Sequence, residues 1–313
     1  MSEAVAIICT RNRPQALQDT LRSIADQEFS AHLAVVLVDG SDDPIYQKNK
    51  RLERQFASLP VCHYRYDGPP SAARQRNVGL QLLPHSTEHV FFFDDDITLA
   101  EGCLEHLRAA LDSSPTLVGV GGSERSSSVA SHPFSLQTQF WKALFLLDHP
   151  DPGRVLPSGH ISSYDALPPD ADLVPTQWLS TCCCLYERSV FEEVQFDDSI
   201  SGALFEDRDL SHRLAHLFGL AVVPRAQFDH HRSPINRRTV RQYARNRTVQ
   251  RYWFVENAIE HPLRKLAYWW ATLGGLLAVL ASSKAEKKEA LRGRLEGIRS
   301  VLRRSSPLLR PPR

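Results

Sequence analysis

The chain has 313 residues, of which 42% are hydrophobic, a composition that is typical of a globular protein and excludes a wholly disordered one. Its 37 basic and 36 acidic residues nearly cancel, so no overall positive charge indicates nucleic acid as the partner. The sequence starts without a basic leader and a long apolar run, and its six cysteines lack disulfide spacing, which predicts a cytoplasmic protein.

The first third of the chain alternates short apolar runs with amphipathic stretches. The apolar runs predict strands over residues 4–10, 33–38, 61–66 and 89–93. The stretches between them predict helices over residues 14–27, 46–57 and 71–83. This alternation predicts an α/β fold in which helices cover a parallel sheet, with ligands bound at the carboxyl ends of its strands.

The composition changes after residue 121. Residues 123–131 and 148–175 are rich in Ser, Pro, Asp and Gly, which predicts loops around a helix near 136–147. A strand is then predicted over 177–186, a helix over 205–218 and a strand over 220–224.

Beyond residue 223 the chain is basic and predicted to be helical to its end. We therefore expect one domain over residues 1–232, made of the halves 1–122 and 123–232, followed by a basic, amphipathic helical region over 233–313.

Three consecutive aspartates, Asp94, Asp95 and Asp96, follow the fourth predicted strand. Unpaired carboxylates at the end of a buried strand repel one another and lose hydration, so a positive partner is expected. Mg²⁺ and Mn²⁺ take oxygen ligands and often share them with phosphates. We predict that Asp96 binds such a metal and that Asp94 binds the metal or a ribose. The competing interpretation is a turn and helix cap.

A second acidic pair, Glu206 and Asp207, stands at the start of a predicted helix. Backbone N–H groups and the helix dipole favour a charged carboxylate there, which would be ionised near neutrality and able to accept a proton from a hydroxyl. We predict Asp207 as the general base and Glu206 as a residue that orients the acceptor. Alternatively, both residues and Asp209 only complement the dipole.

Five motifs follow one another in the order and at the spacing of the family 2 glycosyltransferases. They read AIICTRNRP, VLVDGSDD, SAARQRNVGL, FFFDDDI and FEDRDLSHRL. Over residues 4–223 the chain therefore resembles this family. The resemblance implies a GT-A fold, with a Rossmann-like mixed sheet flanked by helices, here followed by a helical C-terminal extension. It also implies metal-dependent, inverting transfer of a sugar from a nucleotide diphosphate, without a covalent intermediate.

The resemblance assigns the first part of a donor site. Thr10, Arg11 and Arg13 look like the first nucleotide loop, and Asp39 looks like the contact to the base. A carboxylate can accept the imide N–H of uracil or thymine, so UDP- or dTDP-sugars are the favoured donors. A turn residue before Gly40 is the alternative role for Asp39.

The rest of the donor site and the metal site follow from the same resemblance. Arg74, Arg76 and Asn77 look like the helix on the diphosphate side, and guanidinium groups suit phosphates. Asp94 and Asp95 complete the donor contacts. On this pattern residues 1–122 bind the nucleotide sugar, and residues 123–232 bind the acceptor.

The metal site is completed, on the same resemblance, by a histidine. Asp94 and Asp96 match the family's metal-binding positions, and either His230 or His231 would be the further ligand. The sequence does not choose between the two rings, and an exposed pair in a basic loop is the alternative.

Two further features concern the acceptor. Trp178 is predicted to line the acceptor pocket, because an aromatic face suits a sugar ring, and a position in the core is the alternative. Processive synthases of the family carry Gln-x-x-Arg-Trp, whereas Asn246 follows Arg245 here, which favours addition of a single sugar.

The adjacent cysteines Cys182, Cys183 and Cys184 are interpreted as buried thiols. Neighbouring residues on a strand point to alternating faces, so the three cannot readily chelate one zinc ion.

Residues 266–283 are uncharged and flanked by Lys265 and Lys284. This length is at the lower limit for a spanning helix, and the aromatic residues at 268–270 favour an interface. We predict peripheral membrane contact through 262–284, at the inner face of the plasma membrane, with a carbohydrate or lipid-linked acceptor in surface glycan synthesis. A spanning helix, packing on the domain and a homodimer contact are the alternatives.

Two other functions share these features. A non-catalytic scaffold that binds nucleotide sugars would use the same donor site without turnover. A sugar nucleotidyltransferase is less favoured, because residues 9–14 contain no glycine-rich phosphate loop.

Overall fold

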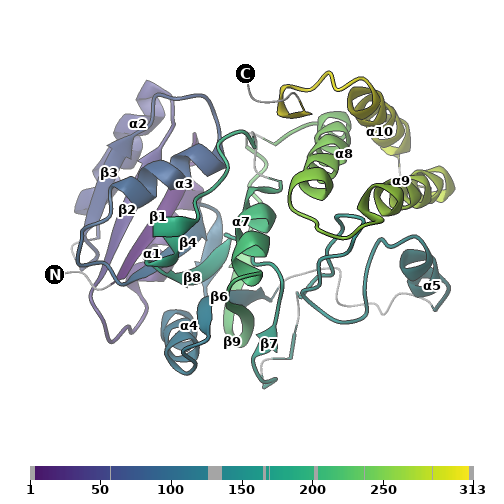
Figure 1. Ribbon diagram of the computed structural model, residues 1–313. Helices are drawn as coiled ribbons and strands as arrows, with labels where there is room; N and C mark the ends of the chain where they lie inside the picture. Colours follow the sequence, from purple (N-terminus) through teal and green to yellow (C-terminus); the bar gives the residue numbers. More distant parts are fainter. Residues whose placement is uncertain are drawn as a thin grey trace. The chain divides into compact units, whose positions relative to one another are not determined.

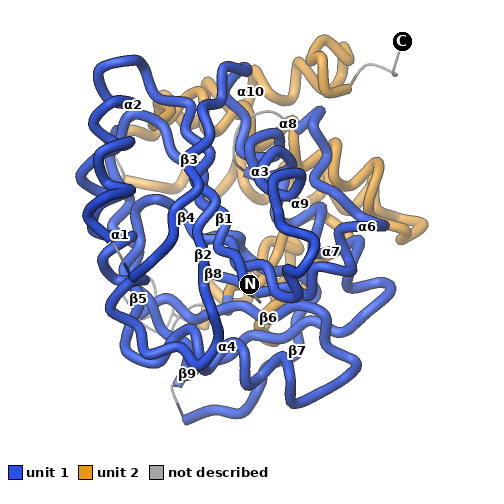
Figure 2. The backbone as a smooth tube through the Cα atoms, turned by 90° about the vertical axis from the view of Figure 1, so that its left-hand side faces the viewer, with its two compact units in different colours: residues 1–131, 164–236 blue, residues 132–163, 237–313 orange. Residues whose placement is uncertain are grey.

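The computed structural model describes residues 4–56, 58–125, 136–164, 167–168, 170–200, 204–235, 237–283 and 285–309. The chain forms two compact units, drawn in blue and orange in Figure 2. The first unit contains residues 1–131 and 164–236, and the second contains residues 132–163 and 237–313. The boundaries of these units differ from the expected ones in two segments, because residues 132–163 belong with the C-terminal helices and residues 233–236 belong to the first unit. The assignment of 123–232 to the acceptor stays a prediction.

The first unit is built on a mixed sheet with the strand order β3-β2-β1-β4-β8-β6-β9-β5, and β7 pairs with β9 (Figure 1). The strands are β1 (Ala4–Thr10), β2 (Leu33–Asp39), β3 (Val61–Arg65), β4 (His89–Asp94), β5 (Ile97–Leu99), β6 (Leu117–Glu124), β7 (Val174–Pro175), β8 (Cys183–Glu187) and β9 (Gly219–His230). Strands β1 to β4 are parallel, whereas β8 is antiparallel to β4 and β6. The mixed sheet implied by the resemblance is therefore confirmed.

The helices of the first unit are α1 (Pro14–Ala25), α2 (Asp43–Lys50), α3 (Ala72–Gln81), α4 (Cys103–Asp112), α6 (Val190–Glu193) and α7 (Glu206–Ala215), with a 3₁₀ turn at Arg51–Arg54. Four of them, α1, α2, α3 and α7, correspond to predicted ones, whereas α4 and α6 were not predicted. In α1, proline occupies the first turn, and Leu17, Leu21 and Ile24 are buried at helical spacing against the sheet. The apolar runs of β1 and β4 are buried on both faces, as expected for central strands.

The ends of three parallel strands meet at one edge of this sheet. Thr10 of β1 pairs in register with Asp39 of β2, and Cys9 pairs with Asp94 of β4. Strand β9 continues to His230, beyond its predicted end, because an irregularity in its pairing with β6 lets it pair with β5 as well. The pairing of Ile97 with His230 then places this histidine beside the aspartates after β4.

The second unit is helical, with α5 (Leu136–Leu144), α8 (Val240–Asn257), α9 (Arg264–Ala281), α10 (Lys287–Leu302) and a 3₁₀ turn at Pro307–Leu309. Helices α8, α9 and α10 pack together (Figure 1). Glycines permit the close approach of α10 to α8, since a Cβ atom on Gly293 would lie 2.2 Å from the Arg241 carbonyl oxygen. Within the described ranges, no helix combines the length and apolar character needed to cross a bilayer.

Candidate active site

The three aspartates after β4 make three different sets of contacts. Asp95 accepts a hydrogen bond from the Thr10 hydroxyl at 2.6 Å and pairs with Arg13 at 2.8 Å. Asp96 lies 3.1 Å from Nε2 of His230 and accepts the Ser233 backbone N–H at 2.8 Å. Asp94 pairs with Arg76 of helix α3 at 3.3 Å. The triplet therefore joins β1, the end of β9 and helix α3, which is more than a turn or helix cap requires.

Arg76 of α3 connects Asp94 with the second acidic pair. Its guanidinium lies 3.3 Å from Asp94 and 2.9 Å from Glu206, and only 6% of the residue is exposed. Burial alone would lower the pKa of Arg76, but the two carboxylates raise it, so the side chain stays charged. The two acidic clusters, which are 112 positions apart between Asp94 and Glu206, thus form one network.

Asp207 lies in the first turn of α7, beside this network. Burial and then the charge of Glu206 raise the pKa of Asp207 to about 7, against the lowering effect of Arg208 and Arg76. The helix start was expected to keep Asp207 ionised at neutrality, whereas desolvation outweighs the dipole and leaves it near half protonation. A carboxylate with a pKa near the working pH is suited to general base catalysis.

The pKa values of two aspartates of the triplet are shifted in opposite directions. Burial raises the pKa of Asp95 to about 6, although Arg13 and Thr10 act in the opposite direction. Burial would also raise the pKa of Asp96, but the hydrogen bond and charge of His230 lower it below its ordinary value. Asp96 is therefore an ionised oxygen donor at neutral pH.

The structure distinguishes the two adjacent histidines. His230 points to Asp96, and its Nδ1 atom lies 3.5 Å from the sulfur of Cys182. The His231 ring instead contacts the Thr98 hydroxyl at 2.9 Å. Of the two rings, that of His230 lies against a carboxylate of the triplet, and its role as a metal ligand stays a prediction.

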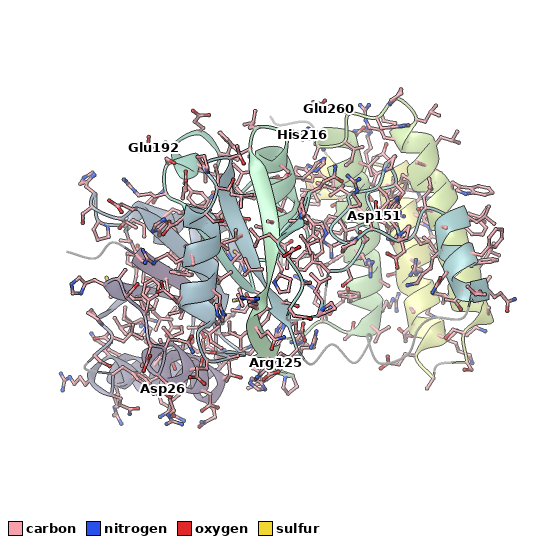
Figure 3. The ribbon with its side chains drawn as sticks, turned by 90° about the horizontal axis from the view of Figure 1, so that it is seen from below. Asp26, Arg125, Asp151, Glu192, His216 and Glu260 are labelled. Carbon is pink, nitrogen blue, oxygen red and sulfur yellow. The ribbon has the colours of Figure 1, made fainter. Side chains whose placement is uncertain are left out.

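Ion pairs fix the strand end that carries His230. Arg125, labelled in Figure 3, directly follows β6 and pairs with Asp229 of β9. Arg232 binds Glu124 through both terminal nitrogens, one of them at 2.8 Å. These pairs flank His230 on both sides and hold its backbone in place.

Cys182 is the functional candidate that sequence reasoning missed. Ligand atoms of Asp94, Cys182 and His230 lie within 4.8 Å of one another, a spacing that a metal ion could bridge. Burial raises the pKa of the Cys182 thiol well above its usual range, so the thiol is neutral at physiological pH. The expected packing role does fit Cys183 and Cys184, which are buried in β8. The position of Cys182 immediately before β8, the neighbour of β4, was visible only after the strand order was known.

The cationic residues expected to contact the donor lie around the same edge. Arg11 and Arg13 follow β1, and Arg13 also donates to the backbone carbonyl of Ile235 at 2.9 Å. Arg74 is exposed near the start of α3, where its Nε donates to the Asp198 carbonyl at 3.3 Å. These three guanidinium groups are partly or fully accessible.

Asn77 has contacts of another kind. Its amide nitrogen donates to the Phe196 carbonyl at 2.9 Å and to Asp198 at 2.7 Å, and its oxygen accepts the Phe196 N–H at 3.1 Å. Both amide hydrogens are thus used in holding this loop, which leaves none for a diphosphate.

Asp39 is completely buried at the end of β2. Its oxygens accept hydrogen bonds from the Ser41 N–H and the Asn49 amide, both at 2.8 Å, and lie 3.0 Å from His63. Because Asp39 has no exposed atom that could contact a nucleobase, these hydrogen bonds favour the alternative turn role, in which Asp39 holds the loop around Gly40.

Trp178 is also more enclosed than a sugar platform requires. The residue is 8% exposed, with the Tyr164 ring 4.5 Å away and the Arg208 guanidinium 5.7 Å from its centroid. These contacts favour the core interpretation over direct stacking on an acceptor.

Comparison with known proteins agrees with this architecture. The model of the family named Glycosyl transferase family 2 matches residues 5–195. The mannosyltransferase PcManGT from Pyrobaculum calidifontis, in complex with GDP-Man and Mn²⁺, is similar with a TM-score of 0.58 and 16% identity, over 98% of this chain and 82% of that one.

A second solved structure, S. aureus TarS 1–349 in complex with UDP-GlcNAc, is similar with a TM-score of 0.58 and 15% identity, over 96% of this chain and 81% of that one. No curated protein sequence matches the chain. Identities this low support the fold, which is GT-A, and the family rests on the sequence match. Because that match spans more than half of the residues, the chain belongs to glycosyl transferase family 2 and is a glycosyltransferase.

Proposed function

We propose that this protein transfers a single sugar, with inversion, from a nucleotide diphosphate sugar to an acceptor hydroxyl, in a metal-dependent reaction. The observation that carries the proposal is the network in which Arg76 joins Asp94 to Glu206, beside Asp207 with its raised pKa. This network links carboxylates that are suited to binding a metal ion and the donor with a carboxylate that is suited to removing the proton of the acceptor hydroxyl.

A divalent cation, Mg²⁺ or Mn²⁺, fits this site by charge and by donor chemistry. Five carboxylates come together there (Asp94, Asp95, Asp96, Glu206 and Asp207) against three guanidinium groups (Arg13, Arg76 and Arg208). Asp94, Asp96 and His230 would hold the ion, which when bound would neutralise charge on the departing diphosphate. The neutral thiol of Cys182 is a poor ligand for such hard cations. One structural neighbour was solved with Mn²⁺.

The acceptor side is assigned to Asp207 and Glu206. In its ionised form Asp207 takes the proton of the acceptor hydroxyl as that oxygen attacks the anomeric carbon, and the diphosphate leaves from the opposite face. One displacement of this kind inverts the configuration. Glu206 is held by Arg76 at 2.9 Å and raises the pKa of its neighbour, so it tunes the base as well as orienting the acceptor.

For the donor, we assign the diphosphate contacts to Arg11, Arg13 and Arg74, which are partly or fully exposed. Arg76 and Asn77 act by holding Asp94 and the loop at 196–198. UDP- and dTDP-sugars stay the first donors to test. One structural neighbour was solved with UDP-GlcNAc and another with GDP-Man. GDP-sugars come next, because the buried Asp39 gives less reason to expect a uracil or thymine base.

The wider setting is also a proposal. A role in surface glycan synthesis, with a carbohydrate or lipid-linked acceptor at the inner face of the plasma membrane, is consistent with the apolar helix α9. Addition of a single sugar is favoured because Asn246 stands where processive members carry tryptophan.

Two variants test the division of roles. Asp207→Asn keeps the size of the side chain but removes the base, so we expect turnover to fall by about 10²- to 10⁴-fold with donor affinity retained. Asp96→Ala should instead weaken donor binding in the presence of Mn²⁺, measured by titration calorimetry. Unaltered turnover in Asp207→Asn would remove this residue from the mechanism.

A further inference from the structure

Helix α9 has two apolar faces, and only one of them is covered. After Lys265 the helix contains no charged residue. Its buried face consists of Ala267, Tyr268, Ala271, Thr272, Gly274 and Gly275. The opposite face exposes large side chains at intervals of three and four residues, namely Leu263, Leu266, Trp270, Leu273, Leu277 and Leu280. A helix that is apolar all round normally lies within a protein core or in lipid, so the second face requires a partner.

Helix α5 enlarges this exposed surface, although it lies more than 120 positions earlier in the sequence. Its Leu136 is 84% exposed and its Phe140 is 69% exposed. The two helices are joined where Phe145 stacks on Trp270 at 4.9 Å and the Trp270 indole donates to the Leu144 carbonyl at 2.8 Å. Figure 1 shows α5 beside α9.

We refer to the exposed side chains of both helices as the apolar face. It comprises Leu136, Phe140, Leu144, Leu263, Leu266, Trp270, Leu273, Leu277 and Leu280. Single exposed leucines are ordinary in proteins, but nine large apolar side chains exposed on two helices that contact each other mark an interaction surface.

The charge of the second unit indicates which partner covers this face. Residues 132–163 and 237–313 contain 20 basic and seven acidic residues, a net charge of +13, whereas the whole chain carries +1. Basic side chains stand at both ends of α9, with Arg264 and Lys265 at its start and Lys287 and Lys288 just after it. Lys287 also donates to the Leu280 carbonyl, which places its ammonium group beside the last leucine of the apolar face.

A second copy of the chain and a lipid bilayer are the two partners to compare. Pairing two copies through this face would bring together two units of the same high positive charge, which opposes association. An anionic bilayer offers the opposite charge, together with an apolar interior for the leucines and an interface that suits tryptophan.

We propose that the apolar face of the second unit binds the surface of an anionic phospholipid bilayer, with α5 and α9 inserted to the depth of the headgroups. The prediction from sequence named only residues 262–284, of which Lys284 lies outside the described residues. The structure adds α5 as the second contact element and the basic start of α10 as the electrostatic contact. The proposal does not depend on the identity of the sugar donor.

Vesicle flotation of the full chain tests this proposal. We expect the protein to float with vesicles of phosphatidylcholine and phosphatidylglycerol, to float much less with phosphatidylcholine alone, and to be released by high salt. The double variant Leu273→Glu/Leu277→Glu places two charges on the apolar face, and the partition coefficient should fall by roughly tenfold or more. Leu217→Glu changes a leucine of the first unit that is even more exposed, and this variant should float like the parent protein.

Three further measurements make the result decisive. Both variants should unfold at the parent temperature, because the substituted side chains are exposed, and both should keep turnover on a water-soluble acceptor. Absence of flotation with anionic vesicles would overturn the proposal, as would flotation that the double variant does not reduce. Sedimentation of the parent chain as a dimer that the double variant dissociates would assign the face to a second copy instead.

Discussion

The two units of this protein carry nearly equal and opposite charge. The first has 17 basic and 29 acidic residues, a net charge of −12, and the second has a net charge of +13. In the first unit the decisive charges are buried and paired, as with Arg76 between Asp94 and Glu206. In the second, most basic side chains are on the surface, and its buried Arg251 is held by polar groups and the Tyr268 ring at 4.4 Å.

The net charge of the whole chain is close to zero, but the two units use their charged residues in different ways. Buried carboxylates acquire shifted pKa values and can perform chemistry, because desolvation makes each protonation state sensitive to its neighbours. Exposed basic residues act together as a field that attracts an anionic partner.

The largest effect should come from breaking the buried pair. Arg76→Met leaves Glu206 and Asp94 without their cation, so we expect a loss of about 3–5 kcal/mol in the free energy of unfolding, measured in urea, with loss of turnover. Arg292→Met is the matched control in the second unit, where the pair with Glu289 is exposed and worth about 0–1 kcal/mol. Equal losses in the two variants would contradict the comparison.

The pH profile should show the next largest effect. Because Asp207 acts in its ionised form and has a pKa of about 7, turnover should fall about tenfold for each pH unit below that value and level off above it.

The stability of the fold should change with pH in the opposite direction. The pKa is raised on folding, so the contribution of Asp207 is present below its unfolded pKa and is lost as the pH rises through about 7. Asp207→Asn should remove this part of the pH dependence of unfolding, and a profile that it leaves unchanged would exclude Asp207 as the titrating group.

The smallest effect is expected at Cys182. Replacement by serine should change activation by Mn²⁺ by less than about threefold, because a hard cation prefers oxygen ligands to a neutral thiol. Binding of Zn²⁺ or Cd²⁺, measured by competition with a fluorescent chelator, should weaken more than that of Mn²⁺. A large loss of Mn²⁺ activation would instead make the thiol a direct ligand.

Much of the fold could be predicted from the sequence, because its first four strands are continuous apolar runs separated by amphipathic helices. The short strand β5, strand β6 with its three glycines and the extension of β9 could not, because they depend on pairing between distant segments. The motifs located the carboxylates and arginines of the site. The motifs did not reveal which side chains would be buried. Asp39, Asn77 and Trp178 were therefore expected to contact ligands, whereas their burial and contacts favour structural roles.

Other parts of the site became visible only through the register of the sheet. The pairing of β5 with β9 brings the ring of His230 beside Asp96, and the order β4-β8 brings Cys182 to Asp94. Similarly, the sequence pattern identified residues 266–283 as an uncharged segment with basic flanks, but the participation of α5 depends on a tertiary contact with Trp270.

Thermal unfolding with nucleotides tests the central claim, a metal-dependent nucleotide sugar site, most directly. The protein would be heated with UDP, dTDP, GDP or CDP, each with Mn²⁺ or with a chelator, alongside the Asp96→Ala variant. Because a ligand that binds only the native state adds about 2.7 kcal/mol at 100 times its Kd, one nucleotide should raise the unfolding temperature with Mn²⁺ and not with chelator. This shift should be absent in Asp96→Ala. Equal stabilisation with and without the metal, or none by any nucleotide, would contradict the account.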